Sequence, residues 1–590
     1  MRLYHKGFTL IELIAVIIIL GIISLITVPT IINLIDSSRM KAAELSADGI
    51  IKSGQQYYYI SKYNGTKITN IIDLKTEDIL KYSGGRPEGG TLIIDNYGNI
   101  SSVMKFQNYC SIKRFVDTEV TTFKIDETNS CEMLASELAL ANTYKDINLN
   151  WADPQLESNM IPVIYDESKW VKADITEEWY NYDKKYWANA VTVTESSRSS
   201  YQSAVAGTEI LESDILTYLV WIPRYRYRIW NDNLSINTTG VNNNKIHTIE
   251  VEFEHSKIDK SNGNTNETWL THPAFTFGDK ELNGFWVSKF EISSDETSLC
   301  YTAESVDNCN VTNIYPKVKP NRTSWRSIQL ANAFQVVRNM ESINNIYGFT
   351  AESVDTHVTK NMEWGAVAYL SHSKFGINKE IRMNNSKLAI TGCAATNVPT
   401  AAYPDYSNYY EGCQNQYNTS AGFLASTTGN ITGIYDISGG SVEFVMGILE
   451  DSPNSNKPMS GYNATTHSGF NGMLSNGGSV VNGIDFPDSK YYDIYNYGTT
   501  AGDVNAYSRG KLGDATMEMG PFGTYSGSDS IPRYINSWYG DLANFVHNNG
   551  PWFVRGSSWA DGSITGAFGY SNFFGSADGR RSFRAIVSVE

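Results

Sequence analysis

The sequence predicts an α+β protein of several domains: a long N-terminal helix with a small antiparallel sheet, a short β-rich domain, and a large domain rich in loops. Three observations lead to this prediction. Residues 13–35 contain no ionisable side chain, and as a helix they would extend about 34 Å, enough to cross a bilayer core of about 30 Å. The chain has 590 residues, too many for one core. Beyond residue 64, short apolar runs alternate with loops rich in glycine, serine and asparagine, as in β-rich domains.

The charge of the chain argues against nucleic acid as a partner. Lysine plus arginine number 47 and aspartate plus glutamate 63, so the formal net charge is −16, whereas phosphate binding needs a concentrated basic surface. Aromatic residues make up 12% of the chain, and they are common both in β-rich cores and on recognition surfaces. Because charged residues are only 19%, we expect an extracellular protein.

Six cysteines form three pairs that are local in sequence. In a chain whose bulk is exported, such pairs predict three disulfides, although six cysteines allow 15 connectivities. The pairs are Cys110 and Cys131, Cys300 and Cys309, and Cys393 and Cys413.

Two details distinguish the N-terminal apolar run from an ordinary secretory signal. The candidate processing site, Gly7-Phe8, precedes the apolar core, so cleavage would leave the helix on the mature protein. Glu12 places a carboxylate at the edge of the run, where an unpaired charge is costly and needs a partner.

These residues resemble the prepilin family, which contains the type IV pilins and the pseudopilins of type II secretion. The resemblance rests on the pattern KGFTLIEL at residues 6–13. It implies that prepilin peptidase cuts between Gly7 and Phe8, that Phe8 is then methylated, and that Glu12 pairs with the N-terminal amine of a neighbouring pilin subunit. Pro29 matches the position at which the family helix bends or melts. The implied location is the cell membrane before assembly and then the pilus at the cell surface.

The predicted domains follow the chain in order. Residues 1–7 form the leader, 8–64 the pilin transmembrane and assembly helix, and 65–145 the globular pilin head, with strand-like runs at 91–101 and 105–125. Residues 146–208 form a small β-rich domain, and residues 209–590 form the large domain, with helices expected within 324–340 and 362–371. We interpret the aromatic residues of the small domain as core rather than as a sugar-binding face; they are Trp170, Trp179, Tyr180, Tyr182 and Trp187.

The order of motifs in the large domain resembles the formylglycine-generating-enzyme superfamily, which has a C-type-lectin-like fold. The corresponding stretches are GFWVSKFEIS, TSWRSIQLANAF, NMEWGAVAYL, SGGSVEFVMG, and VRGSSW with RSFRA. Phe444 replaces the usual Trp of the family, and Ser557 replaces a Gly. The resemblance implies that these motifs hold the fold together, with two arginines in buried ion pairs or on backbone carbonyls and two tryptophans in core or loop pockets: Arg555, Arg584, Trp364 and Trp559.

The sequence does not predict an enzyme. The oxidase members of that superfamily use two reactive cysteines near the C-terminus, and this chain has no cysteine after Cys413. The chain also contains no HExxH and no G-x-S-x-G motif. We expect loop or packing roles for the isolated histidines, among them His357, His372 and His547.

No cofactor and no metal are expected. One alternative is Ca²⁺, which prefers oxygen ligands and could be held by Asp485, Asp488 and Asp493, although their spacing matches no EF-hand loop.

A binding role is supported by the C-terminal segment. Lectin-like folds of this superfamily also display ligand-binding surfaces, including proteins diversified by retroelements between an R-G-G-like and an S-F-R-like frame. Here Arg555-Gly556 and Ser582-Phe583-Arg584 frame residues 557–581, which mix aromatic with small polar residues. An ordinary loop-rich end of the fold without a ligand is the alternative. The predicted ligand-binding residues are Ser557, Ser558, Trp559, Asp561, Ser563, Ile564, Thr565, Tyr570, Asn572, Phe573 and Phe574.

The sequence therefore predicts a minor or tip type IV pilin that displays a lectin-like domain for adhesion to an extracellular protein or glycan. Two alternatives stay open: a surface enzyme acting on glycan or protein, and a pseudopilin of type II secretion.

Overall fold

The computed structural model describes most of the chain in two compact units, residues 1–150 and residues 151–590. The described residues are 10–64, 69, 71–75, 79–82, 84–94, 100–113, 120–125, 131, 152–175, 177–230, 246–254, 269–297, 300, 309–401, 409–471, 484–499, 506–520, 523–525 and 534–589.

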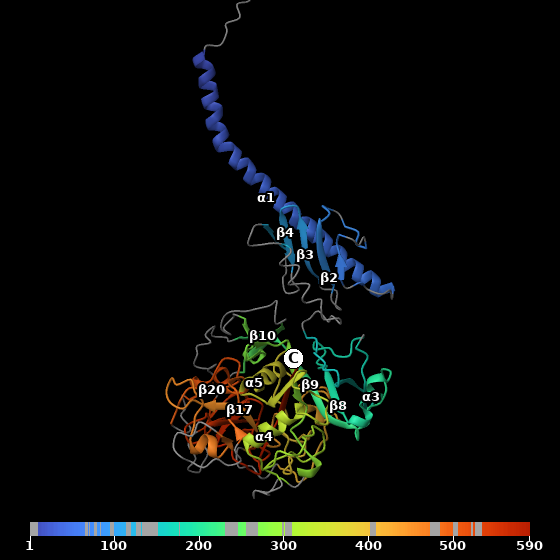
Figure 1. Ribbon diagram of the computed structural model, residues 1–590, viewed down its shortest axis with the longest axis vertical. Helices are drawn as coiled ribbons and strands as arrows, with labels where there is room; N and C mark the ends of the chain where they lie inside the picture. Colours follow the sequence, from blue (N-terminus) through green and yellow to red (C-terminus); the bar gives the residue numbers. More distant parts are fainter. Residues whose placement is uncertain are drawn as a thin grey trace, which may run out of the picture. The chain divides into compact units, whose positions relative to one another are not determined.

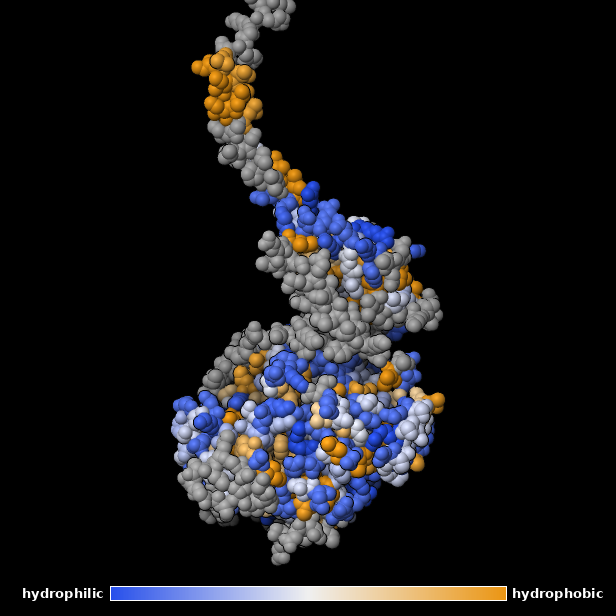
Figure 2. Space-filling view, viewed as in Figure 1, coloured by the Kyte–Doolittle hydropathy of each residue, from blue (hydrophilic) through white to orange (hydrophobic). Residues whose placement is uncertain are grey.

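The first unit begins with one long helix, α1 (Leu10–Asn64). The backbone stays helical through Pro29, and Figure 1 shows α1 as a continuous, curved helix. Apolar side chains are exposed along its first half, where Figure 2 shows a hydrophobic surface. Over the residues that the structure describes, no helix combines the length and the hydropathy needed to span a membrane. The membrane-spanning role of residues 13–35 therefore stays a prediction.

The second half of α1 packs on a five-stranded antiparallel sheet in the order β1-β2-β3-β4-β5. The small residues Ala43 and Ala47 and the larger Ile50 and Tyr58 form the buried face of the helix. This confirms the predicted helix with a small antiparallel sheet. The strands are β1 (Ile71–Asp73), β2 (Gly89–Ile94), β3 (Ile100–Phe106), β4 (Tyr109–Lys113) and β5 (Thr121–Lys124).

Two contacts fix the helix against this sheet. Gly54 lies so close to β3 that a Cβ atom there would stand 2.6 Å from Cδ1 of Ile100. Near the other end of the contact, Lys124 Nζ lies 2.6 Å from Asp36 Oδ2, and the Tyr109 hydroxyl donates to Asp36 Oδ1 at 3.2 Å. A side chain at position 54 would therefore force Ile100 to shift if the helix is to approach the sheet this closely.

The second unit is built around a seven-stranded antiparallel sheet in the order β16-β27-β15-β9-β8-β6-β7. The C-terminal strand β27 lies inside this sheet, between β15 and β16. The strands are β6 (Ile161–Asp166), β7 (Lys169–Lys172), β8 (Asn189–Val193), β9 (Ile215–Pro223), β15 (Gly284–Ser288), β16 (Val354–Val358) and β27 (Ala585–Val589).

This sheet differs from the predicted division into a small domain at 146–208 and a large domain at 209–590. β8 pairs with β9 from Asn189↔Val220 to Val193↔Ile215, so residues on both sides of the predicted boundary share one sheet. Two or three short strands cannot bury both of their faces alone, which explains why they join the larger sheet. Four of the five aromatic residues of the predicted small domain are buried in the core of the unit and Trp179 packs against it, which confirms their interpretation as core.

A second large sheet has the order β20-β17-β24-β25-β23-β22-β21, and β26 also pairs with β17. Its strands are β17 (Val442–Leu449), β20 (Asp493–Tyr495), β21 (Gly523–Tyr525), β22 (Tyr534–Asn536), β23 (Leu542–Ala543), β24 (Trp552–Arg555), β25 (Tyr570–Phe573) and β26 (Arg581–Phe583). Three smaller sheets contain β10 (Tyr225–Trp230), β11 (Thr248–Phe253) and β12 (Leu270–Thr271); β13 (Thr276–Phe277) and β14 (Lys280–Glu281); and β18 (Phe470–Asn471) and β19 (Ile484–Asp485).

Three α-helices accompany these sheets among the described residues of the unit: α3 (Glu195–Ser203), α4 (Leu330–Arg338) and α5 (Asn361–Ser371). The positions of α4 and α5 confirm the two helices predicted in the large domain. Every residue of α5 is buried, and Figure 1 shows this helix in the interior of the unit. At its N-terminus the Lys360 amide donates to the Glu363 carboxylate at 2.7 Å.

All three predicted disulfides are confirmed. They join Cys110 to Cys131, Cys300 to Cys309, and Cys393 to Cys413. The third closes a loop of the second unit that contains Val398 and Pro399.

Candidate functional site

The predicted binding segment, residues 557–581, runs from the end of β24 to the start of β26 and includes β25 of the second large sheet. β24 ends at Arg555, β25 covers residues 570–573, and β26 begins at Arg581. The loop between β24 and β25 therefore starts and ends on one rigid sheet, which is a common way to position binding residues.

The two arginines of this frame have the structural roles that the resemblance implies. Arg584 binds the Glu443 carboxylate with two nitrogens, at 3.0 and 2.6 Å, and also donates to the carbonyls of Ser288 and Tyr435. Arg555 donates to the carbonyl of Ala515 at 3.4 Å. Both guanidinium groups are buried.

The tryptophans of the same motifs also serve packing. Trp364 is buried, and its indole N–H donates to the carbonyl of Ala567 at 2.8 Å. Trp559 is half-buried, with its ring centroid 5.5 Å from that of Tyr409.

Five of the eleven predicted ligand-binding side chains are buried and do not form an exposed surface: Ser557, Ser558, Ile564, Thr565 and Tyr570. Tight turns account for this arrangement. The Asp561 carboxylate accepts from the amide of Ser558 at 2.6 Å and from its hydroxyl at 2.9 Å, so the loop folds back on itself. Sequence pattern alone does not show which face of such a turn points inward.

The other six are partly exposed: Trp559, Asp561, Ser563, Asn572, Phe573 and Phe574. The last two lie at the end of β25 and have protein partners of their own. The Arg581 guanidinium lies 3.3 Å from the ring centroid of Phe573, and the ring of Phe574 lies 5.2 Å from that of His467.

The loop contributes to a cavity of about 410 Å³, which we call the Ser563 groove. This volume lies in the range of small-molecule sites. The wall supplied by the predicted binding segment contains Gly562, Ser563 and Thr565, whereas other parts of the chain supply the rest. The remaining lining residues are Lys379, Glu380, Ile381, Arg382, Met383, Val398, Pro399, Leu424 and Tyr539.

Hydrogen bonds hold the Ser563 wall in place. The Ser563 amide donates to the Ala401 carbonyl at 2.8 Å, and the Leu542 amide donates to the Ile564 carbonyl at 2.9 Å. Beneath the loop, the buried Asp541 carboxylate accepts from the amide of Phe568 at 3.0 Å. Burial raises the pKa of Asp541 well above its ordinary value, and the nearby Glu380 carboxylate adds to this effect.

Aromatic and charged groups share the groove. Tyr539 has φ +62°, a left-handed conformation that is rare for a bulky residue, and its ring stacks on Phe568 at 6.2 Å. Such strain is found most often at functional sites. Burial raises the pKa of Glu380, and Arg382 opposes that effect, while Arg382 Nη1 donates to the Thr396 carbonyl at 2.9 Å.

Sequence reasoning missed residues 379–383, Val398, Pro399, Leu424 and Tyr539. The one sequence feature that pointed to any of these residues was the predicted disulfide between Cys393 and Cys413, because it constrains the loop around residue 398. The contact of that loop with the C-terminal segment is not local in sequence, so the pattern could not reveal it.

The predicted packing roles of the histidines agree with their burial. His357 Nδ1 lies 3.2 Å from Asp355 Oδ1, and its Nε2 lies 2.9 Å from Glu363 Oε1, so both ring nitrogens are occupied. The ring of His372 packs 4.5 Å from that of Phe568, and burial lowers its pKa to about 4. His547 is also buried.

Two of the three aspartates considered for Ca²⁺, Asp488 and Asp493, have separate partners. Asp488 caps a short turn by accepting from the Lys490 amide at 3.0 Å, and Asp493 accepts from the Met362 amide at 2.8 Å. In the part of the chain that the structure describes, no three acidic, histidine or cysteine side chains are grouped so that they could hold a metal ion.

The side chains of the predicted processing and assembly residues lie outside the described part of the chain. Gly7 and Phe8 are not among the described residues, and for Glu12 and Pro29 the structure describes the helical backbone but not the side chain.

The comparisons with known proteins concern the N-terminus. The family described as "Prokaryotic N-terminal methylation motif" matches residues 2–28. No curated protein matches the chain. The motif implies anchoring in the membrane and then a place on the pilus surface, after processing by prepilin peptidase and assembly with other pilus subunits. The motif at residues 2–28 suggests a type IV pilin-like or pseudopilin-like protein.

Proposed function

We propose that this protein is a minor or tip subunit of a type IV pilus whose second unit binds an extracellular protein or glycan in the Ser563 groove. The N-terminal helix inserts the subunit into the filament, and the second unit carries out adhesion. A head of more than four hundred residues at every step of a filament would be hard to accommodate, which favours a minor or tip position over a major one.

One observation carries the proposal. The segment that sequence reasoning selected for ligand binding supplies Ser563 and Thr565 to a preformed cavity whose other walls come from distant parts of the chain. A tyrosine ring, aliphatic side chains and a few polar groups meet there, a combination typical of sites for sugars and peptides. The half-exposed Tyr539 offers a face for stacking, and Ser563 offers a hydroxyl that both donates and accepts.

We propose binding without catalysis. Among the described residues that line the groove, Glu380 is the one carboxylate, whereas most glycoside hydrolases use a pair of carboxylates on either side of the bond they cleave. The C-type-lectin-like assignment of the second unit is part of the proposal. It is supported by the motif order and by β27, which returns the end of the chain to the first large sheet.

The proposal extends to diversification of residues 557–581. Variation at the partly exposed positions other than Asp561 would change the surface while leaving the buried positions and the Asp561 turn intact. Sequencing this segment from several isolates of one strain tests the idea. Variation at adenine positions of the gene, confined to the codons between Arg555 and Arg584, would support diversification. An invariant segment would exclude diversification and leave the adhesion proposal unaffected.

The binding proposal is tested with the full-length mature protein in nanodiscs, applied to an array of immobilised glycans and to immobilised collagen and fibronectin. We expect at least one of these probes to bind, and Ser563→Trp, which fills the groove, to abolish that binding. Ser199→Trp is the matched control, because Ser199 is exposed on α3 and does not line the groove. Equal binding by Ser563→Trp and the unsubstituted protein would contradict the proposal.

A further inference from the structure

The Ser563 groove carries an excess of positive charge on an acidic protein. Lys379 and Arg382 line it, and Glu380 is the one carboxylate among its described lining residues. The chain as a whole has a formal net charge of −16. Beneath the groove, burial raises the pKa of Asp541 well above its ordinary value, which disfavours a second negative charge there. The groove is therefore a cationic site on an otherwise acidic protein.

Both cations are available to a ligand. Lys379 is exposed and Arg382 is half-buried, and in the part of the chain that the structure describes neither forms an ion pair. The Arg382 guanidinium donates one N–H to the Thr396 carbonyl at 2.9 Å, within the loop closed by the third disulfide. This bond fixes the guanidinium and leaves its other N–H groups for a carboxylate, which can accept two of them side by side.

Two hydroxyl groups of the groove are also available. Among the described residues, neither the Tyr539 hydroxyl nor the Ser563 hydroxyl has a hydrogen-bond partner, whereas the buried Thr565 hydroxyl donates to the Ser558 carbonyl at 3.2 Å. Each of the two available hydroxyls can both donate and accept a hydrogen bond. Together with the Glu380 carboxylate they match a ligand that carries several hydroxyl groups of its own.

Aromatic and aliphatic side chains provide the apolar part of the groove. The half-buried Tyr539 ring lies on one side, and Val398, Pro399 and Leu424 supply aliphatic walls. A mostly apolar lining with a few convergent polar groups is typical of sites for small ligands. The C–H groups of a sugar ring can pack on such walls while its hydroxyls reach the polar groups.

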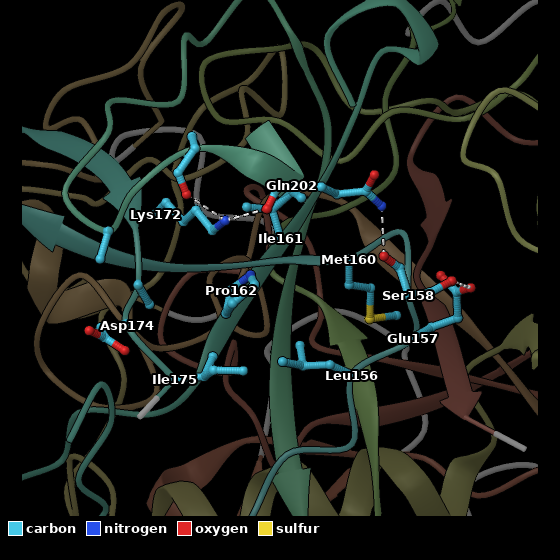
Figure 3. A pocket seen from close by; sticks show the side chains of 13 residues that line it. Leu156, Glu157, Ser158, Met160, Ile161, Pro162, Lys172, Asp174, Ile175 and Gln202 are labelled. Carbon is cyan, nitrogen blue, oxygen red and sulfur yellow. Dashed lines mark hydrogen bonds between the residues drawn. The ribbon is translucent and has the colours of Figure 1, made fainter. Parts of the chain in front are cut away.

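A second cavity of the same unit, of about 560 Å³, provides a contrast (Figure 3). Lys172 is the one basic residue among its described lining residues, and its Nζ donates to the carbonyls of Gln202 and Ala204, at 2.6 and 2.8 Å. No aromatic side chain is among these lining residues. This cavity therefore holds its cation against backbone carbonyls and offers no ring, so it lacks the combination found in the Ser563 groove.

We propose that the ligand of the Ser563 groove is an acidic sugar of a glycan, with its carboxylate on Arg382 and Lys379 and its ring against Tyr539. This inference rests on the proposed function, because it names the ligand class of the same site. The Ser563 hydroxyl and the Glu380 carboxylate bind the hydroxyl groups of the sugar. An acidic peptide supplies a carboxylate but not a ring with several hydroxyls, so the sugar matches more of the groups that line the groove.

Three acidic oligosaccharides are the probes: sialyllactose, a hyaluronan tetrasaccharide and trigalacturonic acid. Each is titrated into the full-length mature protein in nanodiscs by isothermal titration calorimetry, beside its methyl ester, which removes the negative charge and keeps the sugar. We expect at least one acid to bind saturably and its ester to bind at least tenfold more weakly. A peptide of glycine and glutamate is the probe for an acidic protein ligand, and it should also bind at least tenfold more weakly than that acid.

Two variants test the position of the carboxylate. Arg382→Gln should weaken binding of the acid at least tenfold, whereas Arg322→Gln, at an exposed arginine outside the groove, should not change it. Lys379→Gln alters an exposed side chain and should weaken binding as well. Lys374→Gln is its matched control, because Lys374 is also exposed and does not line the groove.

Failure of this inference is distinct from failure of the adhesion proposal. If the groove binds a neutral glycan, collagen or fibronectin but none of the three acids, adhesion stands and the acidic sugar is wrong. Equal affinity for an acid and its ester would overturn the inference, as would equal affinity for the glutamate peptide. Unchanged binding of the acid by Arg382→Gln and Lys379→Gln would do so as well.

Discussion

His357 Nε2 lies 2.9 Å from Glu363 Oε1, and both side chains are buried. The second ring nitrogen faces Asp355, so the imidazole bridges two carboxylates of the second unit. Burial alone would lower the pKa of His357, but the charges and hydrogen bonds of Glu363 and Asp355 outweigh it and raise the pKa to about 9.

The stability of the second unit should therefore fall in alkaline solution. Because the pKa of His357 is about 9 in the folded state and about 6.5 in the unfolded state, its contribution is complete below pH 6.5 and disappears as the pH rises through 9. The shift corresponds to about 3 kcal/mol. All 13 tryptophans lie in the second unit. Urea unfolding followed by tryptophan fluorescence from pH 6 to 10 therefore measures the stability of this unit as a function of pH.

The control for this prediction is a second histidine. His357→Gln should be less stable than the unsubstituted protein at pH 6, and the difference should shrink above pH 9. His467→Gln should change little at either pH, because His467 is half-buried beside Phe574. A constant difference between His357→Gln and the unsubstituted protein across this range would contradict the assignment.

The pair of Arg584 and Glu443 should be essential for stability. Arg584→Met leaves the Glu443 carboxylate buried without its bidentate partner, and we expect a loss of about 3–5 kcal/mol in the free energy of unfolding. The exposed pair of Arg322 and Asp295, at 3.1 Å, provides the comparison. Arg322→Met should cost less than about 1 kcal/mol, and equal losses for the two variants in urea unfolding would refute the prediction.

The packing of α1 on the first sheet should depend on Gly54. A valine there would meet Ile100 and Leu92, and overpacking of this kind costs about 1–3 kcal/mol. Hydrogen exchange of the α1 amides between residues 43 and 58 should accelerate in Gly54→Val. Gly89→Val is the control, because a Cβ at Gly89 has no atom within 4 Å; similar acceleration in both variants would argue against a close approach at position 54.

The N-terminal motif predicts where the mature chain begins and how its first residue is modified. After expression in a cell that contains prepilin peptidase, intact-mass measurement should find a chain that begins at Phe8 and carries one N-terminal methyl group. Gly7→Arg should leave the seven-residue leader attached, whereas Lys6→Arg, which keeps the charge before the cleavage site, should be processed normally. Cleavage of Gly7→Arg at the same bond would show that the motif is not used.

The sequence predicted the elements whose pattern is local. The apolar run predicted α1, helical spacing predicted α5, and nearest-neighbour pairing predicted all three disulfides. It could not predict that β8 pairs with β9, which removes the expected boundary at residue 208, because strand pairing between distant segments depends on the burial of the whole sheet.

The candidate site was predicted in part for the same reason. Residues 557–574 were selected by their frame and composition, but whether Ser557 or Ser563 faces outward depends on turns set by Asp561 and Asp541. The opposite wall of the groove, around Arg382 and Pro399, comes from more than 150 residues earlier in the chain. The sequence of the C-terminal segment does not indicate this contact.

The central claim, that the second unit binds its ligand in the Ser563 groove, is tested most directly by dissociation constants. The array probe that binds most tightly is measured by surface plasmon resonance against the unsubstituted protein, Ser563→Trp and Ser199→Trp. We predict that Ser563→Trp binds at least tenfold more weakly and that Ser199→Trp binds normally. A dissociation constant for Ser563→Trp equal to that of the unsubstituted protein would contradict the account.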